Sequence, residues 1–309
     1  MAFRRHILSA IALSSLVCFT SSVSAQNRTF SFAYDQPPTT AYGIAANIFD
    51  AKLKELSGGK MSINQFPGAQ LGQEPQMLQK MRAGDIDFVI TSTANASTVA
   101  PQAGVFSLHF LFRDQNHLAK SLADPAISQA FRDMTKESVT GARTLGLLTM
   151  GLRNMYSKKE ISNVNDIKGQ KIRVQATKTE DTHFPAYGAQ VVHMPFGDVY
   201  TSLQTGVVSI AENGINVYLA NKHYEVAPVL SITEHEANNN CLWISDKTWN
   251  SLTPEQQQIR FDLTPDGNNH KTIGDTFHYA IEKLSDGRTL LIGAWQTDDQ
   301  FLKTYFAES

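Results

Sequence analysis

The chain has 309 residues, of which 42% are hydrophobic and 18% charged, and its net charge is −2 at pH 7. This balance is ordinary for a globular protein and gives no reason to expect nucleic acid or an anionic membrane as a partner. The two cysteines are Cys18 and Cys241. If Cys18 is removed with a leader, Cys241 cannot form an internal disulfide or a cysteine-based metal site, and we expect it to be a small buried hydrophobe.

The first 25 residues resemble a secretory signal peptide. Arg4 and Arg5 form a basic start, and residues 7–20 are apolar but too short and too rich in serine to cross a membrane. Residues 23–25 are small and suit a cleavage site. We therefore expect residues 1–25 to be removed and the mature protein to be periplasmic; an uncleaved membrane anchor is the alternative.

The first half of the mature chain alternates between strand-like and helix-like segments. Strands are expected at residues 29–34, 61–66 and 85–91. Helices are expected from residue 41 to the glycines at 58 and 59, from 75 to 84, and from 119 to 136 with an interruption at Pro125.

The second half continues this alternation. Strands are expected at residues 145–150, 170–174, 190–193 and 207–212, and helices at 181–187, at 199–206 with Asp198 as its cap, and after Thr253. Such alternation predicts an α/β fold with mainly parallel sheets. Removing 25 residues from 309 leaves 284, near the size at which one core divides into two. Two lobes are therefore plausible.

Two arginines follow apolar segments in positions that suit a ligand site. Arg153 comes after residues 145–152, and Arg173 lies between Ile172 and Val174 in a strand-like run. The planar guanidinium can hold a carboxylate through two parallel hydrogen bonds, which lysine cannot do. Taken alone, the alternative is two ordinary surface arginines.

Several motifs in order point to one family. They are PGAQLGQE at residues 67–74, GDIDF at 84–88, FLFRD at 110–114, KIRV at 171–174, MPFGDVYTSLQTG at 194–206 and the pair EN at 212–213. Together they closely resemble the DctP-like periplasmic solute receptors of TRAP transporters. The resemblance covers roughly residues 28–260.

The resemblance implies a two-lobed, periplasmic-binding-protein-like α/β fold with a ligand cleft between the lobes. The expected division is residues 26–150 plus 237–278 for one lobe and 151–236 plus 279–309 for the other, with hinges near 150 and 237. It also implies a monomeric receptor without metal or other cofactor, whose partners are a small carboxylate and the membrane subunits of a TRAP permease.

The same resemblance assigns roles in the second lobe. Arg173 is the expected carboxylate anchor, and Arg153 is expected to be a second cation on the same anion. Asn213 can hold a carboxylate oxygen or a hydroxyl, or cap the helix after it. Phe196 is expected to form an apolar wall of the pocket, with core packing as the alternative.

Polar residues of the first lobe are expected to bind the rest of the ligand. Glu74 would accept hydrogen bonds from ligand hydroxyls; alternatively its charge only favours the N-terminus of the helix after it. Thr91, Ser92 and Asp35 close strands, and strand C-termini are where open α/β sheets bind ligands.

The function expected from these features is a non-enzymatic receptor for an organic acid. The sequence has no Gly-x-Ser-x-Gly elbow, His-Glu-x-x-His helix or phosphate loop. Because Glu74 would repel a second carboxylate, a hexuronate such as glucuronate or galacturonate is favoured. Alternatives are a C4-dicarboxylate, a small hydroxy acid, or a sensor coupled to a kinase. Two features depart from the family pattern: Ser209-Ile210 before the EN pair, and the glycine-interrupted tail after about residue 260.

Overall fold

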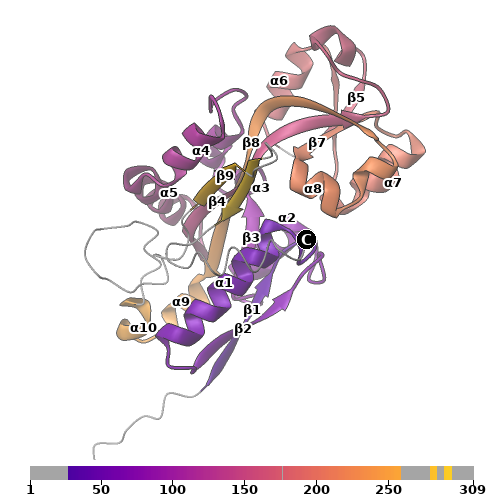
Figure 1. Ribbon diagram of the computed structural model, residues 1–309. Coiled ribbons are helices and arrows are strands. Elements are labelled where there is room, and N and C mark those ends of the chain that lie inside the picture. The colour runs from indigo at the N-terminus through magenta and orange to yellow at the C-terminus, as the bar shows by residue number, and fades with distance from the viewer. Residues whose placement is uncertain (1–26, 176, 259–278, 284–288, 294–309) are drawn as a thin grey trace, which may run out of the picture.

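The computed structural model describes residues 27–175, 177–258, 279–283 and 289–293 (Figure 1). Eight strands form one sheet in the order β2-β1-β3-β8-β4-β7-β5-β6. Their bounds are β1 (Arg28–Ala33), β2 (Met61–Phe66), β3 (Phe88–Ser92), β4 (Ala142–Ser157), β5 (Lys171–Val174), β6 (Gln190–His193), β7 (Ile210–Gly214) and β8 (Val229–Ser245). The expected signal peptide and nearly all of the atypical tail lie outside the described residues.

Strands β4 and β8 run through the whole length of the protein. They contain 16 and 17 residues and pair with each other in antiparallel fashion. We call lobe I the part of the sheet around β1, β2 and β3, and lobe II the part around β5, β6 and β7 (Figure 1). Within each lobe the outer strands pair in parallel. The expected two-lobed α/β fold is thus confirmed, with one continuous mixed sheet shared by both lobes.

Lobe I packs helices on both faces of its sheet. The elements are α1 (Ala41–Leu56), α2 (Glu74–Ala83), α3 (Thr93–Ala96), η1 (Pro101–Ser107), α4 (Gln115–Leu122), α5 (Pro125–Ser138), α9 (Asp246–Asn250) and α10 (Pro254–Gln258). On one face Phe32, Phe49 and Phe88 pack ring against ring under α1. Burying each such ring contributes roughly 1.5–3 kcal/mol. The other face holds Trp243 and the apolar sides of α2, α4 and α5.

Lobe II also has two cores, one on each face of its sheet. Its helices are η2 (Val164–Ile167), α6 (Glu180–Ala186), η3 (Phe196–Asp198), α7 (Val199–Thr205), α8 (Ile215–Ala220) and η4 (His223–Glu225). Ile172 and Val174 of β5 join the core beside α6, and Tyr156 joins the core beside α7 and α8. Since strand side chains alternate between faces, Arg173 lies on the α7–α8 face.

Most of the expected element boundaries are reproduced within a few residues. Gly84 ends α2 in the left-handed conformation, with φ 83°, which glycine adopts without strain. Thr253 and Gln256 form the expected reciprocal cap of α10. The expected side-chain cap of α7 is absent: Asp198 is the N-cap residue, but its backbone is already helical because the turn η3 leads directly into α7.

The backbone of the two long strands is irregular midway between the lobes. The β4–β8 register shifts between Thr149 and Leu152 and again between Arg153 and Met155. Gly151 lies there with φ 90°, which favours glycine. Among the described residues, no helix is both long and apolar enough to cross a membrane. Strands β9 (Tyr279–Lys283) and β10 (Thr289–Gly293) form a separate antiparallel pair.

Candidate functional site

Arg173 is a buried cation with no acidic partner within hydrogen-bonding range among the described residues. Its side chain is on the α7–α8 face and only 3% exposed. Nε and Nη2 donate to the carbonyl oxygen of Met194 at 3.2 and 2.9 Å. In the described part of the chain, no carboxylate lies within 4.0 Å of it. Burial lowers the pKa of Arg173, so an anion bound to the outer edge of its guanidinium would offset a real electrostatic cost.

Phe196 lies beside this arginine, as a pocket wall would. The guanidinium carbon of Arg173 is 6.0 Å from the centre of the Phe196 ring. The ring is partly buried and also packs against the cores of both lobes. Phe196 can therefore pack in the core and also form a pocket wall, because one side of its ring contacts the cores and another lies near Arg173.

Lobe I presents Asp35 toward the same region. Asp35 is buried and accepts a hydrogen bond from Gln36 at 3.1 Å. Burial and the nearby charge of Glu74 raise the pKa of Asp35 well above its usual value, while Gln36 and the charge of Arg173 oppose this shift. The charge of Arg173 thus acts on Asp35 from the other lobe.

Glu74 begins α2 and is already bound by other side chains. One carboxylate oxygen accepts hydrogen bonds from the Ser92 backbone and hydroxyl at 2.9 and 2.8 Å and from Asn95 at 2.7 Å. The other accepts one from Tyr42 at 3.2 Å. Only this second oxygen retains a free lone pair. These hydrogen bonds hold Glu74 rigidly. Its position at the start of α2 also agrees with the alternative, in which its charge favours the N-terminus of that helix.

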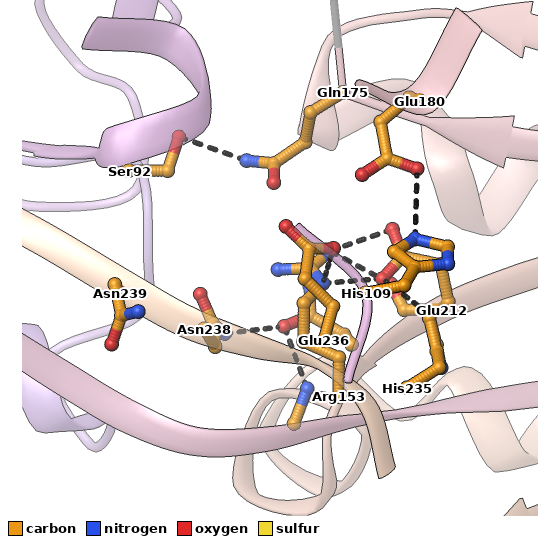
Figure 2. Close-up of polar contacts among 12 residues, drawn as sticks. Ser92, His109, Arg153, Gln175, Glu180, Glu212, His235, Glu236, Asn238 and Asn239 are labelled. Atoms are coloured by element: carbon orange, nitrogen blue, oxygen red, sulfur yellow. Dashed lines mark hydrogen bonds and ion pairs between the residues drawn. The ribbon is translucent and has the colours of Figure 1, made fainter. Parts of the chain in front are cut away.

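Ser92 and Thr91 point to opposite sides of strand β3. The Ser92 hydroxyl accepts a hydrogen bond from Gln175 of lobe II at 2.8 Å (Figure 2). Thr91 is fully buried and accepts a hydrogen bond from the indole of Trp243 at 2.9 Å. Alternation along β3 therefore places Ser92 at the lobe boundary and Thr91 in the core of lobe I.

Asn213 belongs to a run of buried amides that the sequence reading did not select. Its carbonyl oxygen accepts from the Gly214 backbone at 2.8 Å and from Asn238 at 2.7 Å. Gly214, not Asn213, is the N-cap of α8, so the helix-cap alternative is wrong. Both side-chain polar atoms of Asn239 are buried without a partner among the described residues. Three successive asparagines inside an apolar strand were a signal that could have been noticed.

Arg153 is fully engaged by carboxylates, unlike Arg173. It is 2% exposed and forms a two-bond ion pair with Glu212, while Nε lies 3.3 Å from Glu236 (Figure 2). Burial alone lowers the pKa of Arg153, but Glu212 and Glu236 outweigh it and keep the pKa above its usual value. Pairing in register with β7 places Arg153 and Met155 on the α6 face, opposite Arg173.

Several hydrogen bonds between the described residues join the lobes. Besides Gln175 and Ser92, Asn221 donates to Gln36 at 3.3 Å and the Gly197 backbone donates to the Gln73 side chain at 3.4 Å. The lobes are therefore in contact through residues that neighbour Asp35 and Arg173 in the chain.

Comparison with known proteins identifies this architecture. A family described as "Bacterial extracellular solute-binding protein, family 7", or DctP, matches residues 32–263. The chain belongs to this family.

Relatives of the DctP family extend the match over most of the chain. The "2,3-diketo-L-gulonate-binding periplasmic protein YiaO" of Escherichia coli K12 is 30% identical over 271 residues, covering 86% of this chain and 80% of the relative. A TRAP solute-binding protein from Xanthobacter autotrophicus Py2, solved with β-D-galacturonate, is 32% identical with a TM-score of 0.70 and coverages of 74% and 76%.

A second solved DctP-like structure holds a different acid. The TRAP protein from Shewanella oneidensis, with bound succinate, is 26% identical with a TM-score of 0.70, covering 75% of each chain. This protein is therefore a non-enzymatic TRAP solute receptor for organic acids, a family that works with membrane permease components. The fold alone does not select the ligand, since relatives with equal similarity of fold hold different acids.

Proposed function

We propose that this receptor binds a sugar acid, such as glucuronate or galacturonate, in the space between Arg173 and Asp35. The observation that carries the proposal is the buried guanidinium of Arg173. Its inner edge is fixed by the Met194 carbonyl at 2.9 and 3.2 Å. Its outer edge is left to receive the two oxygens of a ligand carboxylate.

The groups opposite Arg173 favour hydroxyls over a second carboxylate. Asp35 and the less occupied oxygen of Glu74 are acceptors in lobe I. The amide nitrogen of Asn213 is a donor in lobe II, because its oxygen is already used twice. A monocarboxylate with several hydroxyls satisfies these groups, whereas a dicarboxylate would bring its second charge against Glu74. The galacturonate held by one relative agrees with this choice.

The family resemblance predicts that Arg153 contacts the ligand carboxylate directly. Because Arg153 lies on the face of the sheet opposite Arg173, this contact is not part of the proposal. The charge of Arg153 is compensated by Glu212 and Glu236, so we assign the main electrostatic contribution to Arg173.

We further propose that ligand binding brings the lobes together in the periplasm. A monomeric receptor would rotate about the irregular stretch of β4 and β8, which includes Gly151 and lies near the expected hinges at residues 150 and 237. The closed form would then be recognised by a TRAP permease. Each lobe alone supplies only part of the contacts, so closure couples affinity to conformation.

Calorimetric titration with glucuronate, galacturonate and succinate tests the ligand class. Glu74→Gln should weaken binding of the uronates, because its carbonyl is a weaker acceptor than a carboxylate. It should leave succinate binding unchanged or stronger, because a like charge is removed. Tight binding of succinate, with no binding of either uronate, would assign the protein to the dicarboxylate receptors instead.

A further inference from the structure

A second polar cluster, of His109, Glu180, His235 and Glu236, lies beside Phe184 of α6 and brings together both lobes (Figure 2). His109 comes from the loop after η1 in lobe I, and Glu180 begins α6 in lobe II. His235 and Glu236 are adjacent in β8. One ligand atom each from His109, His235 and Glu236 lie within 4.8 Å of one another. His109 Nε2 is also 3.6 Å from a carboxylate oxygen of Glu180.

The atoms that face one another in this cluster lack hydrogen-bond partners among the described residues. They are Nε2 of His109, Nε2 of His235 and both carboxylate oxygens of Glu180. The side chains of His109, Glu180 and His235 are each about 2% exposed. Buried polar atoms without partners are uncommon and costly, at roughly 1–3 kcal/mol each. A common partner bound between these side chains would satisfy them.

The charges of the cluster indicate the sign of that partner. Glu180, Glu212 and Glu236 are buried near the guanidinium of Arg153, and the charge of Arg173 also acts on Glu180. Three carboxylates against two guanidiniums leave one negative charge when all are ionised. The Nδ1 atom of His109 lies 3.1 Å from the Tyr187 hydroxyl, so Nε2 is the nitrogen that is available to a metal. A divalent cation would offset the remaining negative charge.

We propose that His109, His235, Glu236 and Glu180 form a binding site for a divalent transition metal of the Zn²⁺ type. Two imidazoles and two carboxylates make a four-ligand set that suits tetrahedral Zn²⁺. The metal would join the loop after η1 to helix α6. It would therefore link lobe I to lobe II on the face away from the proposed ligand space.

The donor atoms of His109, His235 and Glu236 fit after a small contraction, whereas Glu180, 3.6 Å from His109, must rotate toward them to become the fourth ligand. The centre of a triangle with sides of 4.8 Å lies about 2.8 Å from each corner, against roughly 2.0–2.2 Å for a zinc–ligand bond. Each donor atom would thus move inward by about 0.7 Å, which side-chain rotation can supply. Nε of Arg153 lies 3.3 Å from one oxygen of Glu236, and the other oxygen would bind the metal.

The alternative explanation is that protons, and not a metal, neutralise the carboxylates. Burial raises the pKa of Glu180 to about 8, with the charge of Glu212 adding to the shift. A proton shared between Glu180 and Glu236 would neutralise one of these carboxylates. It would leave Nε2 of His109 and Nε2 of His235 without partners among the described residues. The metal satisfies all four side chains at once, and metal binding distinguishes the two explanations.

The test uses the purified full-length mature protein, first stripped with a chelator. Titration should show that the protein binds one equivalent of Zn²⁺. Mass spectrometry of the metal content should show that this Zn²⁺ remains bound after dialysis. Co²⁺ in the same site should give the visible absorption of tetrahedral coordination. Glu180→Gln, which preserves side-chain size, and His109→Gln should each weaken Zn²⁺ binding by at least about 100-fold, since even outer partners of metal ligands contribute about 10- to 100-fold.

His193→Asn is the matched control for adventitious binding. His193 is a more exposed histidine that pairs with Asp181 at 2.7 Å, so it also offers imidazole next to a carboxylate. Zn²⁺ affinity should be unchanged in this variant. The proposal is overturned by failure of the wild-type protein to bind one equivalent, by undiminished binding in a correctly folded Glu180→Gln protein, or by loss of binding in His193→Asn. Circular dichroism verifies the fold, and organic-acid titration separately monitors the other site.

Discussion

Arg173→Lys keeps a positive charge in the ligand space and removes the planar fork. Lysine cannot donate two parallel hydrogen bonds to one carboxylate. The Met194 carbonyl receives two hydrogen bonds from Arg173. The lysine ammonium could not hydrogen-bond both this carbonyl and the ligand with the same geometry. Organic-acid affinity should therefore fall even though the formal charge is unchanged.

The magnitude follows from the bonds that are lost. A hydrogen bond to a charged group contributes about 1.5–3 kcal/mol, so losing one weakens binding about 10- to 150-fold, at 1.4 kcal/mol per tenfold. Arg173→Met removes the charge entirely and should cost about 2–5 kcal/mol of binding free energy. It should not lower the unfolding midpoint of the ligand-free protein, because burial already disfavours this charge.

Isothermal titration calorimetry with whichever acid binds the wild-type protein measures both effects, and thermal unfolding checks the fold. Arg82→Lys is the control, because Arg82 also donates to a backbone carbonyl, that of Thr140, but at the surface. Wild-type affinity in Arg173→Lys would refute the bidentate site. Equal loss in Arg82→Lys would show that the effect is not specific to the cleft.

Three further outcomes are expected. Thr91→Val should lower the free energy of unfolding, measured by chemical denaturation, by about 1–3 kcal/mol, because the Trp243 indole loses its acceptor. Ligand affinity should be unchanged, and weakened binding would place Thr91 in the ligand site. Burial, aided by the charge of Arg173, lowers the pKa of His223 from 6.5 to about 4. Between pH 6.5 and about 4 the His223 imidazole is therefore protonated in the unfolded chain and neutral in the folded protein. About 3 kcal/mol of stability should be lost as the pH falls through that range, and His223→Gln should flatten the slope, which an unchanged profile would contradict. Saturating ligand should reduce the radius of gyration in small-angle scattering, and an identical profile with and without ligand would argue against closure.

Much of the architecture was predictable because it depends on local signals. The spacing of apolar residues, with glycine and proline at the ends of elements, predicted most helices and strands. It also predicted the break at Pro125, which is the first residue of α5. The motif order identified the family and directed attention to Arg173, whose buried position between Ile172 and Val174 agrees with its strand context.

Pairings between distant residues were not predictable in this way. Nothing in the sequence around Arg153 indicates that Glu212 and Glu236 compensate its charge, because those partners are brought close only by the pairing of β4 with β7 and β8. The same holds for His109 and Glu180, which come from different lobes. The side chains of the proposed metal site come from three separate segments of the chain, so no closely spaced motif in the sequence indicates it.

The shared strands β4 and β8 constrain how this protein can evolve. Each strand contributes residues to both lobes, so a lobe is not a contiguous stretch of the gene that recombination could transfer intact. Inserting or deleting one residue midway along either strand would move every later side chain to the other face of the sheet. In residues 142–157 this would turn a largely buried strand inside out. New ligand preferences in this lineage should therefore arise by substitution at the cleft, while the two halves of the molecule are inherited together.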